Sequence, residues 1–154
     1  MAYRIVLSAC LAGLRTRYDG GSRPHPLLEV LRTRGVLVPV CPEVLGGLGI
    51  PRLPCRFSGG DGVAVLRGQA NLIDAQGTDR TFSFLRGAEE TVRVVELVSP
   101  NLIIFKEGSP SCGLRRVDIE GTKQPGCGVA TALLGRTRFP MISEEEALPE
   151  ALHI

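Results

Sequence analysis

Short apolar runs separated by polar segments mark the predicted strands of this chain. Residues 4–9, Val36–Val40 and Leu102–Phe105 are almost wholly apolar and partly β-branched, which is typical of strands buried on both faces of a parallel sheet. Phe139–Ile142 predicts a last strand. No run approaches the roughly 18 apolar residues that indicate a membrane-spanning helix.

Helical periodicity appears between these strands. Apolar residues recur at steps of three and four from Phe82 to Val95, with Arg and Glu between them, which predicts an amphipathic helix. Shorter helices are predicted over 26–34, ended by Gly35, and over Val129–Leu134. The alternation favours an α/β fold: a single three-layer domain over residues 1–154, with a mostly parallel sheet, helices on both faces and right-handed crossovers.

The segment from Pro51 to Gly77 breaks this alternation. It is rich in proline and glycine and holds two short alternating runs, Val63–Arg67 and Ala70–Asp74. These runs predict a small β-hairpin excursion or lid.

Composition and charge narrow the class of protein. With 154 residues, 44% of them hydrophobic, the chain is large enough to bury a core. The net charge is only +2, and Lys and Arg are scattered among acidic residues, so neither nucleic acid nor a membrane surface is expected as a partner. Five cysteines without a close, even spacing indicate a reducing compartment, so we expect a cytoplasmic protein.

Leu7–Cys10 resembles a lipoprotein cleavage box, but the nine residues before Cys10 are too few for a signal of about 15–30 residues.

Three of the cysteines follow predicted strands. Cys10 closes the first apolar run, Cys41 closes the second, and Cys112 comes shortly after the third. Because the carboxyl ends of parallel strands share one edge of a sheet, we expect these thiols to converge. Thiolates suit either zinc or an iron–sulfur cluster, and the two histidines and the lack of a C-x-x-C pair disfavour an ordinary structural zinc motif. Burial as small apolar side chains is the plain structural alternative.

Polar residues beside these cysteines suggest catalysis. Glu43 comes two residues after Cys41, in a turn where a carboxylate can act as a general base, and Ser109 and Ser111 place hydroxyls beside Cys112. Each has a structural alternative: Glu43 can favour the start of a helix, and the serines can satisfy amides in a tight turn.

Five sequence blocks together resemble a known family. SACLAGLRTRYDGG, CPEVLGGLGIPRLP, FLRGAEE, KEGSPSCG and GCGVATALL are similar, in matching order, to the domain of unknown function 523 family, which includes the bacterial 2-thiouracil desulfidases. The blocks cover nearly the whole chain, and such a series is far more specific than any single short motif.

The resemblance implies an iron–sulfur enzyme of sulfur metabolism. It implies a 4Fe-4S cluster held by Cys10, Cys41 and Cys112, with the fourth iron open to sulfur from a substrate. The implied reaction removes sulfur from a small thiocarbonyl compound, a thiolated nucleobase such as 2-thiouracil, and releases sulfide and the oxo product. Iron–sulfur assembly machinery would then be a partner.

The resemblance also implies roles for the nearby polar residues. An acidic residue would activate water, with Glu43 as the first choice and Asp19 as the second, and Ser109 and Ser111 would supply orienting hydroxyls. Asp19 stands in Y-D-G, so it also has the look of a turn residue.

Two other functions stay open at this point. One is a cluster-free enzyme with a cysteine nucleophile, and the other is a non-enzymatic module that senses metal or redox state through iron–sulfur or zinc.

For Cys55 and Cys127 the sequence allows an approach to the cluster, a sulfur relay or no role, and we favour no role. Leu114–Gly121 lacks the tyrosine found in many relatives, so the sequence does not decide between a base, a nucleoside and a nucleotide as substrate.

Overall fold

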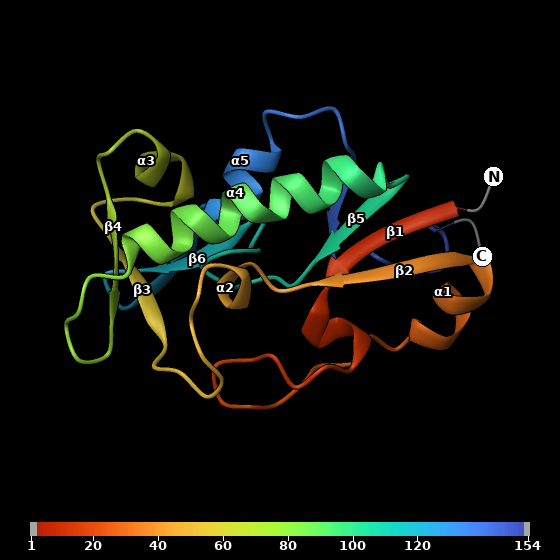
Figure 1. Ribbon diagram of the computed structural model, residues 1–154, viewed down its shortest axis with the longest axis horizontal. Coiled ribbons are helices and arrows are strands. Elements are labelled where there is room, and N and C mark those ends of the chain that lie inside the picture. Colours follow the sequence, from red (N-terminus) through yellow and green to blue (C-terminus); the bar gives the residue numbers. More distant parts are fainter. Residues whose placement is uncertain (1–2, 153–154) are drawn as a thin grey trace.

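The computed structural model describes residues 3–152 and contains the predicted parallel sheet (Figure 1). Its strands lie in the order β2-β1-β5-β8, and each neighbouring pair is parallel. Their bounds are β1 (Tyr3–Ser8), β2 (Gly35–Val40), β5 (Leu102–Phe105) and β8 (Met141–Ser143). The first and last strands are each displaced by one or two residues at their ends from the predicted ranges, and the parallel arrangement is confirmed.

Helices cover both faces of this sheet. Successive side chains of a strand point to opposite faces, so a wholly apolar strand such as β1 presents apolar side chains on both faces. The helices concerned are α1 (Leu28–Arg34), α4 (Thr81–Val98) and α5 (Val129–Leu134). Ile5 of β1 packs in one cluster with Leu31 of α1, whereas its neighbour Val6 lies in the other cluster with Ala88 of α4. The predicted three-layer α/β fold is therefore confirmed. Within residues 3–152, no helix combines the length and apolar character needed to cross a membrane.

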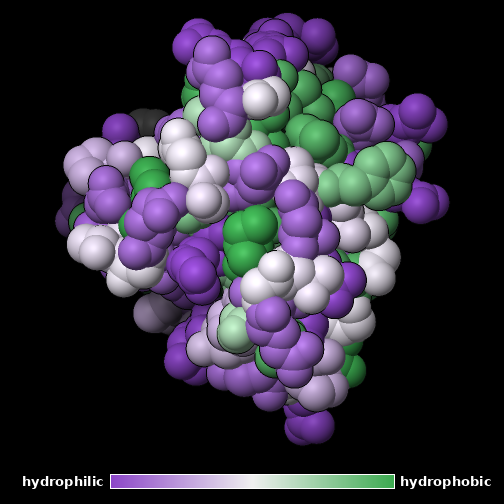
Figure 2. Space-filling model, turned by 90° about the vertical axis from the view of Figure 1, so that its left-hand side faces the viewer, coloured by the Kyte–Doolittle hydropathy of each residue, from purple (hydrophilic) through white to green (hydrophobic). Residues whose placement is uncertain are grey.

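A second sheet lies beside the first. Its order is β4-β3-β6-β7, with strands β3 (Cys55–Ser58), β4 (Asn71–Asp74), β6 (Arg116–Ile119) and β7 (Thr122–Pro125). The sequence predicted β4 but not the β6–β7 hairpin, because all four residues of β7 are exposed and no apolar alternation marks them. The face of the molecule on the side of β3 and β4 is covered mostly by hydrophilic side chains (Figure 2).

One predicted element is wrong. Val63–Arg67 was expected to form a strand of a hairpin, but the structure has helix α3 (Gly62–Leu66) there. Asp61 begins this helix, since its Oδ1 accepts the N–H groups of Val63 and Ala64 at 3.1 and 3.3 Å. A side-chain cap of this kind favours a helix over the strand that a short alternating run suggests. The true partner of β4 is β3.

Close packing of α2 (Pro42–Leu45) against α4 positions the turn that follows β2. A Cβ added at Gly87 of α4 would lie 2.0 Å from the Pro42 carbonyl oxygen, and one at Gly46 would lie 2.0 Å from the Ser83 carbonyl oxygen. Only glycine permits this approach of two backbones. The contact fixes the position of Cys41 and Glu43, which flank Pro42 in sequence.

We therefore expect Gly87→Ala to destabilise the protein. Alanine favours a helix over glycine by about 1 kcal/mol, but the clash with Pro42 requires movement of backbone, for which overpacking costs of about 1–3 kcal/mol are typical. Thermal unfolding should show a melting temperature lower by about 2–4 °C per kcal/mol. The matched control is Gly49→Ala, whose added Cβ would come no closer than 3.9 Å to its nearest neighbour, the Pro51 carbonyl oxygen. An unchanged melting temperature for Gly87→Ala would contradict the proposed packing constraint.

Candidate active site

The three cysteines that follow strands converge on one cleft. Cys10, Cys41 and Cys112 all line a cavity of about 390 Å³ at the carboxyl ends of β1, β2 and β5. The chain passes from β1 to β2 on one side and later returns to β5 on the other side of β1, so the cleft lies where the strand order reverses. Parallel sheets usually bind ligands at this point. The predicted convergence of the thiols is confirmed.

Each of these cysteines is held by a different local structure. Cys10 lies in a 3-10 helix, Ala9–Ala12, which ends at Gly13 with a φ of 89°. Cys41 precedes α2, and its thiol lies 3.9 Å from the Thr16 carbonyl oxygen. Cys112 lies in the turn after β5, where its N–H donates to Ser109 Oγ at 3.1 Å.

The glycines of the GCG block support this last turn. A Cβ at Gly128 would lie 2.3 Å from the Ser111 carbonyl carbon and 2.7 Å from the Cys112 nitrogen. In addition, Thr131 of α5 donates to the Cys112 carbonyl oxygen at 2.9 Å. Helix α5 therefore packs directly on the turn that carries Cys112.

Burial raises the pKa of all three thiols. For Cys10, burial outweighs the opposing effect of the nearby Arg17 and Lys106 cations. Burial also raises the pKa of Cys41, against the effect of the Val44 N–H, and holds the pKa of Cys112 well above its usual range. The negative forms of these thiols also oppose one another, which adds to the rise in the pKa of Cys10 and Cys112.

The donor set suits a soft metal centre. Thiolates bind iron and zinc, and Arg17 and Lys106 are cations close enough to Cys10 to offset negative charge. Within residues 3–152, no three His, Cys, Asp or Glu side chains meet closely enough to hold a single metal ion. A four-iron cluster does not need such a meeting point, because each cysteine binds a different iron.

Glu43 lies in the same cleft and is held on both sides. Its Oε1 accepts a hydrogen bond from Arg52 Nε at 2.9 Å, in an ion pair whose side chains are 14% and 9% exposed. Its Oε2 lies 3.5 Å from Ser109 Oγ and 3.4 Å from Ser111 Oγ, the outer limit of hydrogen bonding. Glu43 does stand in the first turn of α2, as the structural alternative expected, but its carboxylate is directed to these partners.

Arg52 connects Glu43 to the loop after β1. Its Nη2 donates to the Thr16 carbonyl oxygen at 2.9 Å, the same oxygen that Cys41 contacts. Its backbone N–H donates to the Tyr18 carbonyl oxygen at 2.8 Å. Arg52 thereby fixes both the carboxylate and the loop, a role that no sequence pattern indicated.

Asp19 is not brought together with these residues. It does not line the cleft; its Oδ1 accepts the Gly21 N–H at 2.9 Å, and it pairs with Arg17 at 3.7 Å. The Gly21 N–H is the main cause that lowers the pKa of this carboxyl, which makes it a weaker base. The geometry therefore favours Glu43 over Asp19 as the candidate base.

The two serines have backbone roles as well. Ser109 Oγ accepts the N–H groups of Ser111 and Cys112, both at 3.1 Å, so the turn alternative holds for this residue alongside its contact with Glu43. Ser109 lines the cleft, whereas Ser111 is buried and only 2% exposed. Ser109 is thus the hydroxyl better placed to meet a ligand.

The other two cysteines occupy different places. Cys55 lines the cleft, and burial followed by the Glu43 charge raises its pKa to about 11. Cys127 lies outside the cleft; its N–H donates to Asp61 Oδ2 at 3.0 Å, and burial raises its pKa to about 11. Neither thiol has the lowered pKa that favours a cysteine nucleophile.

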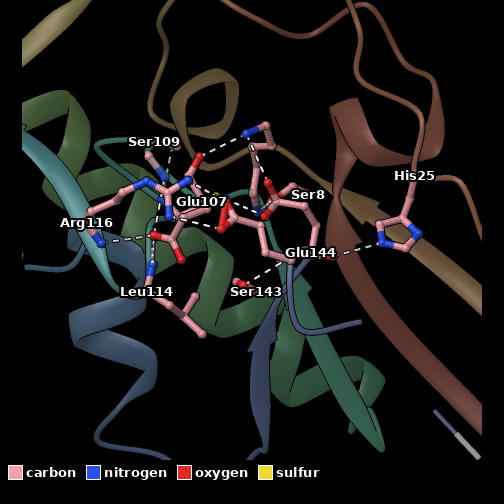
Figure 3. Close-up of polar contacts among 12 residues, drawn as sticks. Ser8, His25, Glu107, Ser109, Leu114, Arg116, Ser143 and Glu144 are labelled. Atoms are coloured by element: carbon pink, nitrogen blue, oxygen red, sulfur yellow. Dashed lines mark hydrogen bonds and ion pairs between the residues drawn. The ribbon is translucent and has the colours of Figure 1, made fainter. Parts of the chain in front are cut away.

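Sequence reasoning missed several charged residues that line the cleft, namely Lys106, Glu107, Asp118 and Lys123. Glu107 is buried, and its Oε1 accepts the N–H groups of Leu114, Arg115 and Arg116 at 2.9 to 3.1 Å (Figure 3). Its own N–H donates to Glu144 Oε2 at 2.6 Å. The available sign of this hydrogen-bonded group around Glu107 was the K-E pair that starts the KEGSPSCG block, directly after a buried strand.

Comparison with known proteins agrees with this geometry. A family model described as 2-thiouracil desulfurase matches residues 5–146. The chain belongs to this family. It is 37% identical over 145 residues to the uncharacterized protein YbbK of Bacillus subtilis strain 168, over 92% of this chain and 96% of YbbK. Among solved structures it is similar to the [4Fe-4S]-dependent thiouracil desulfidase TudS, with a TM-score of 0.81 and 36% identity, over 98% of this chain and 96% of TudS. The family resemblance carried by the sequence blocks is confirmed.

Proposed function

We propose that this protein is a [4Fe-4S]-dependent desulfidase that removes sulfur from a thiolated nucleobase such as 2-thiouracil. The observation that carries the proposal is the meeting of three thiols with Glu43 in one cleft at the carboxyl edge of the parallel sheet. Membership of the 2-thiouracil desulfurase family and the similarity to TudS support the same activity. The cavity of about 390 Å³ falls within the range of small-molecule sites.

The cluster ligands we propose are Cys10, Cys41 and Cys112. They are the thiols that influence one another electrostatically, and Arg17 and Lys106 stand beside Cys10 to offset the charge of the bound group. When bound, the cluster would supply an iron without a protein ligand, which acts as a Lewis acid and sulfur acceptor. Cluster assembly machinery is then an expected partner.

Glu43 is the residue we assign to water activation. Its Oε1 is engaged by Arg52, so Oε2, which faces the serine hydroxyls, is the oxygen placed to take a proton from water. Ser109 and Arg52 hold this carboxylate in one orientation. The reaction balances without an oxidant: the water oxygen bonds to the thiocarbonyl carbon, the C–S bond breaks, and sulfur leaves as hydrogen sulfide.

The cluster-free alternative has less support. A nucleophilic cysteine needs a lowered pKa, whereas burial raises the pKa of each of the five thiols.

All five cysteines are free of disulfides, which supports a reducing, cytoplasmic location.

Anaerobic reconstitution with iron and sulfide tests this proposal. We expect a brown protein with about four irons per chain, and release of one sulfide for each 2-thiouracil converted to uracil. Removal of iron with a chelator should abolish sulfide release, and a second reconstitution should restore it. An intact cluster without sulfide release would favour the sensing module instead, and full activity after iron removal would favour a cysteine nucleophile.

A further inference from the structure

A carboxylate oxygen on the second sheet is buried without a hydrogen-bond partner. Asp118 of β6 lines the cleft, and no donor among residues 3–152 reaches its Oδ1, although this atom is shielded from solvent. A buried acceptor left unpaired is costly, so native proteins leave few of them. Such an atom in the wall of a ligand cleft indicates a donor supplied by the ligand.

Lys123 stands directly across the hairpin from Asp118. The two residues are paired in the register of β6 and β7, so their side chains share one face, and both line the cleft. No ion pair joins them in the described part of the chain. The Lys123 ammonium donates to the Gly108 carbonyl oxygen at 3.1 Å, which leaves two of its three N–H groups for other partners.

This pair belongs to a different sheet from the cysteines. The cluster ligands that we propose follow strands of the first sheet, whereas Asp118 and Lys123 come from the β6–β7 hairpin of the second sheet. The cleft is thus lined from both sheets, with thiols supplied by one and an acceptor beside a donor supplied by the other. The residues that would hold the cluster and the residues available to bind the substrate ring therefore come from different sheets.

Among residues 3–152, two other buried polar atoms of the cleft also lack hydrogen-bond partners, and both are less suited to recognition. Arg17 Nε lies beside the Asp19 carboxylate, and its charge acts on Cys10. Glu107 Oε2 belongs to a carboxylate whose other oxygen already accepts four backbone N–H groups. Asp118 Oδ1, by contrast, holds no backbone amide or cation of residues 3–152.

We propose that Asp118 and Lys123 recognise the substrate by hydrogen bonds to one edge of its ring. Asp118 accepts the ring N–H that neighbours the thiocarbonyl, and Lys123 donates to the adjacent exocyclic carbonyl oxygen. This inference rests on the proposed function. In 2-thiouracil, N3–H lies between the thiocarbonyl and the C4 carbonyl, so it offers a donor beside an acceptor. In 2-thiocytosine both are reversed, since N3 accepts and the C4 amine donates.

The pair therefore acts as a specificity determinant for uracil-type over cytosine-type rings. A site built to pair with a substrate group rejects an analogue that leaves its buried polar atoms unmatched. Uracil, the product, carries the same edge as 2-thiouracil, so its binding reports recognition independently of C–S cleavage.

Asp118→Asn tests this inference in the reconstituted protein. The side-chain amide of asparagine can either accept or donate a hydrogen bond, so the variant can pair with a uracil-type ring or with a cytosine-type ring. We expect the dissociation constant for uracil to rise by up to about tenfold, because a neutral amide oxygen accepts a weaker hydrogen bond than a carboxylate oxygen does. The preference for uracil over cytosine, measured by anaerobic calorimetry, should fall at least tenfold, while the iron content stays unchanged.

The matched control is Glu120→Gln. Glu120 follows β6 on the same hairpin, does not line the cleft, and bonds the Gly59 N–H at 3.0 Å, which the amide oxygen can still accept. This variant should keep the preference of the unmodified protein. An unchanged preference in Asp118→Asn overturns the inference, even where sulfide release continues. Failure of the proposed function shows instead as absent sulfide release by unmodified, reconstituted protein, whatever the effect of Asp118→Asn on uracil binding.

Discussion

Replacing Cys10, Cys41 or Cys112 singly by alanine will cost the protein its cluster and its sulfide release. All three thiols line the same cleft at the ends of neighbouring strands, and a three-ligand site has no spare protein ligand. Reconstituted variants should hold well below the roughly four irons of a complete cluster and lack its visible absorption. Circular dichroism and thermal unfolding will show that each variant keeps the fold, because a small side chain replaces another small one.

Cys127→Ala is the matched control for these substitutions. Cys127 is also a partly buried free thiol, but it lies outside the cleft beside Asp61. It should retain iron, absorption and activity. Cys55→Ala should also retain iron and absorption, since the charges that act on Cys55 include Glu43 and Asp74 but none of the three proposed ligand thiols. Full iron content in any one of the three ligand variants would refute the assignment of that cysteine.

Glu43→Gln will lower kcat for sulfide release by about 10²- to 10⁴-fold, the range typical for loss of a general acid or base. The amide oxygen can still accept the Arg52 Nε–H that now reaches Oε1 at 2.9 Å, so the side chain should keep its place. Its nitrogen cannot take a proton from water. Iron content and absorption should match the unmodified protein, which separates loss of the base from loss of the cluster.

Asp19→Asn provides the same acid-to-amide change outside the cleft. Asp19 is bonded to the Gly21 N–H and is held in the loop after β1, so the variant should keep nearly full activity. A large loss in Asp19→Asn together with a small loss in Glu43→Gln would reverse the two assignments. A similar loss in both would point to a loop movement rather than to one base.

The fold could be predicted where a segment buries its own apolar side chains. The strand before Cys10 and the long helix over Phe82–Val95, which buries Ala88 and Val95, carry the pattern that their burial requires. The strand before Cys41 was also predicted, but it lies at the edge of the sheet and buries only Val40, so the expectation that both of its faces are buried is wrong. Prediction failed where other interactions decide. The side-chain cap at Asp61 turned Val63–Arg67 into a helix, and β7 forms through pairing with β6 although none of its residues is buried.

The candidate site divides in the same way. Cys10, Cys41, Cys112 and Glu43 could be named because the ends of parallel strands share an edge, a rule that depends only on strand order. The sequence left Asp19 open between a second-choice base and a turn residue, and the structure favours the turn, since Asp19 Oδ1 accepts the Gly21 N–H. Neither could it find Arg52, whose importance comes from contacts with residues 9 and 36 positions away.

The sequence by itself determined the three-layer α/β fold, the family and the thiols that meet at one edge of the sheet. These follow from local periodicity and from blocks that stand in a fixed order. Only the tertiary structure decided which polar groups share the cleft with the thiols. The second sheet brings Asp118 and Lys123 there, and close backbone contacts at Gly87 and Gly128 set the two turns that carry Glu43 and Cys112. Such contacts join residues far apart in the chain, and they depend on backbone distances that no sequence pattern records.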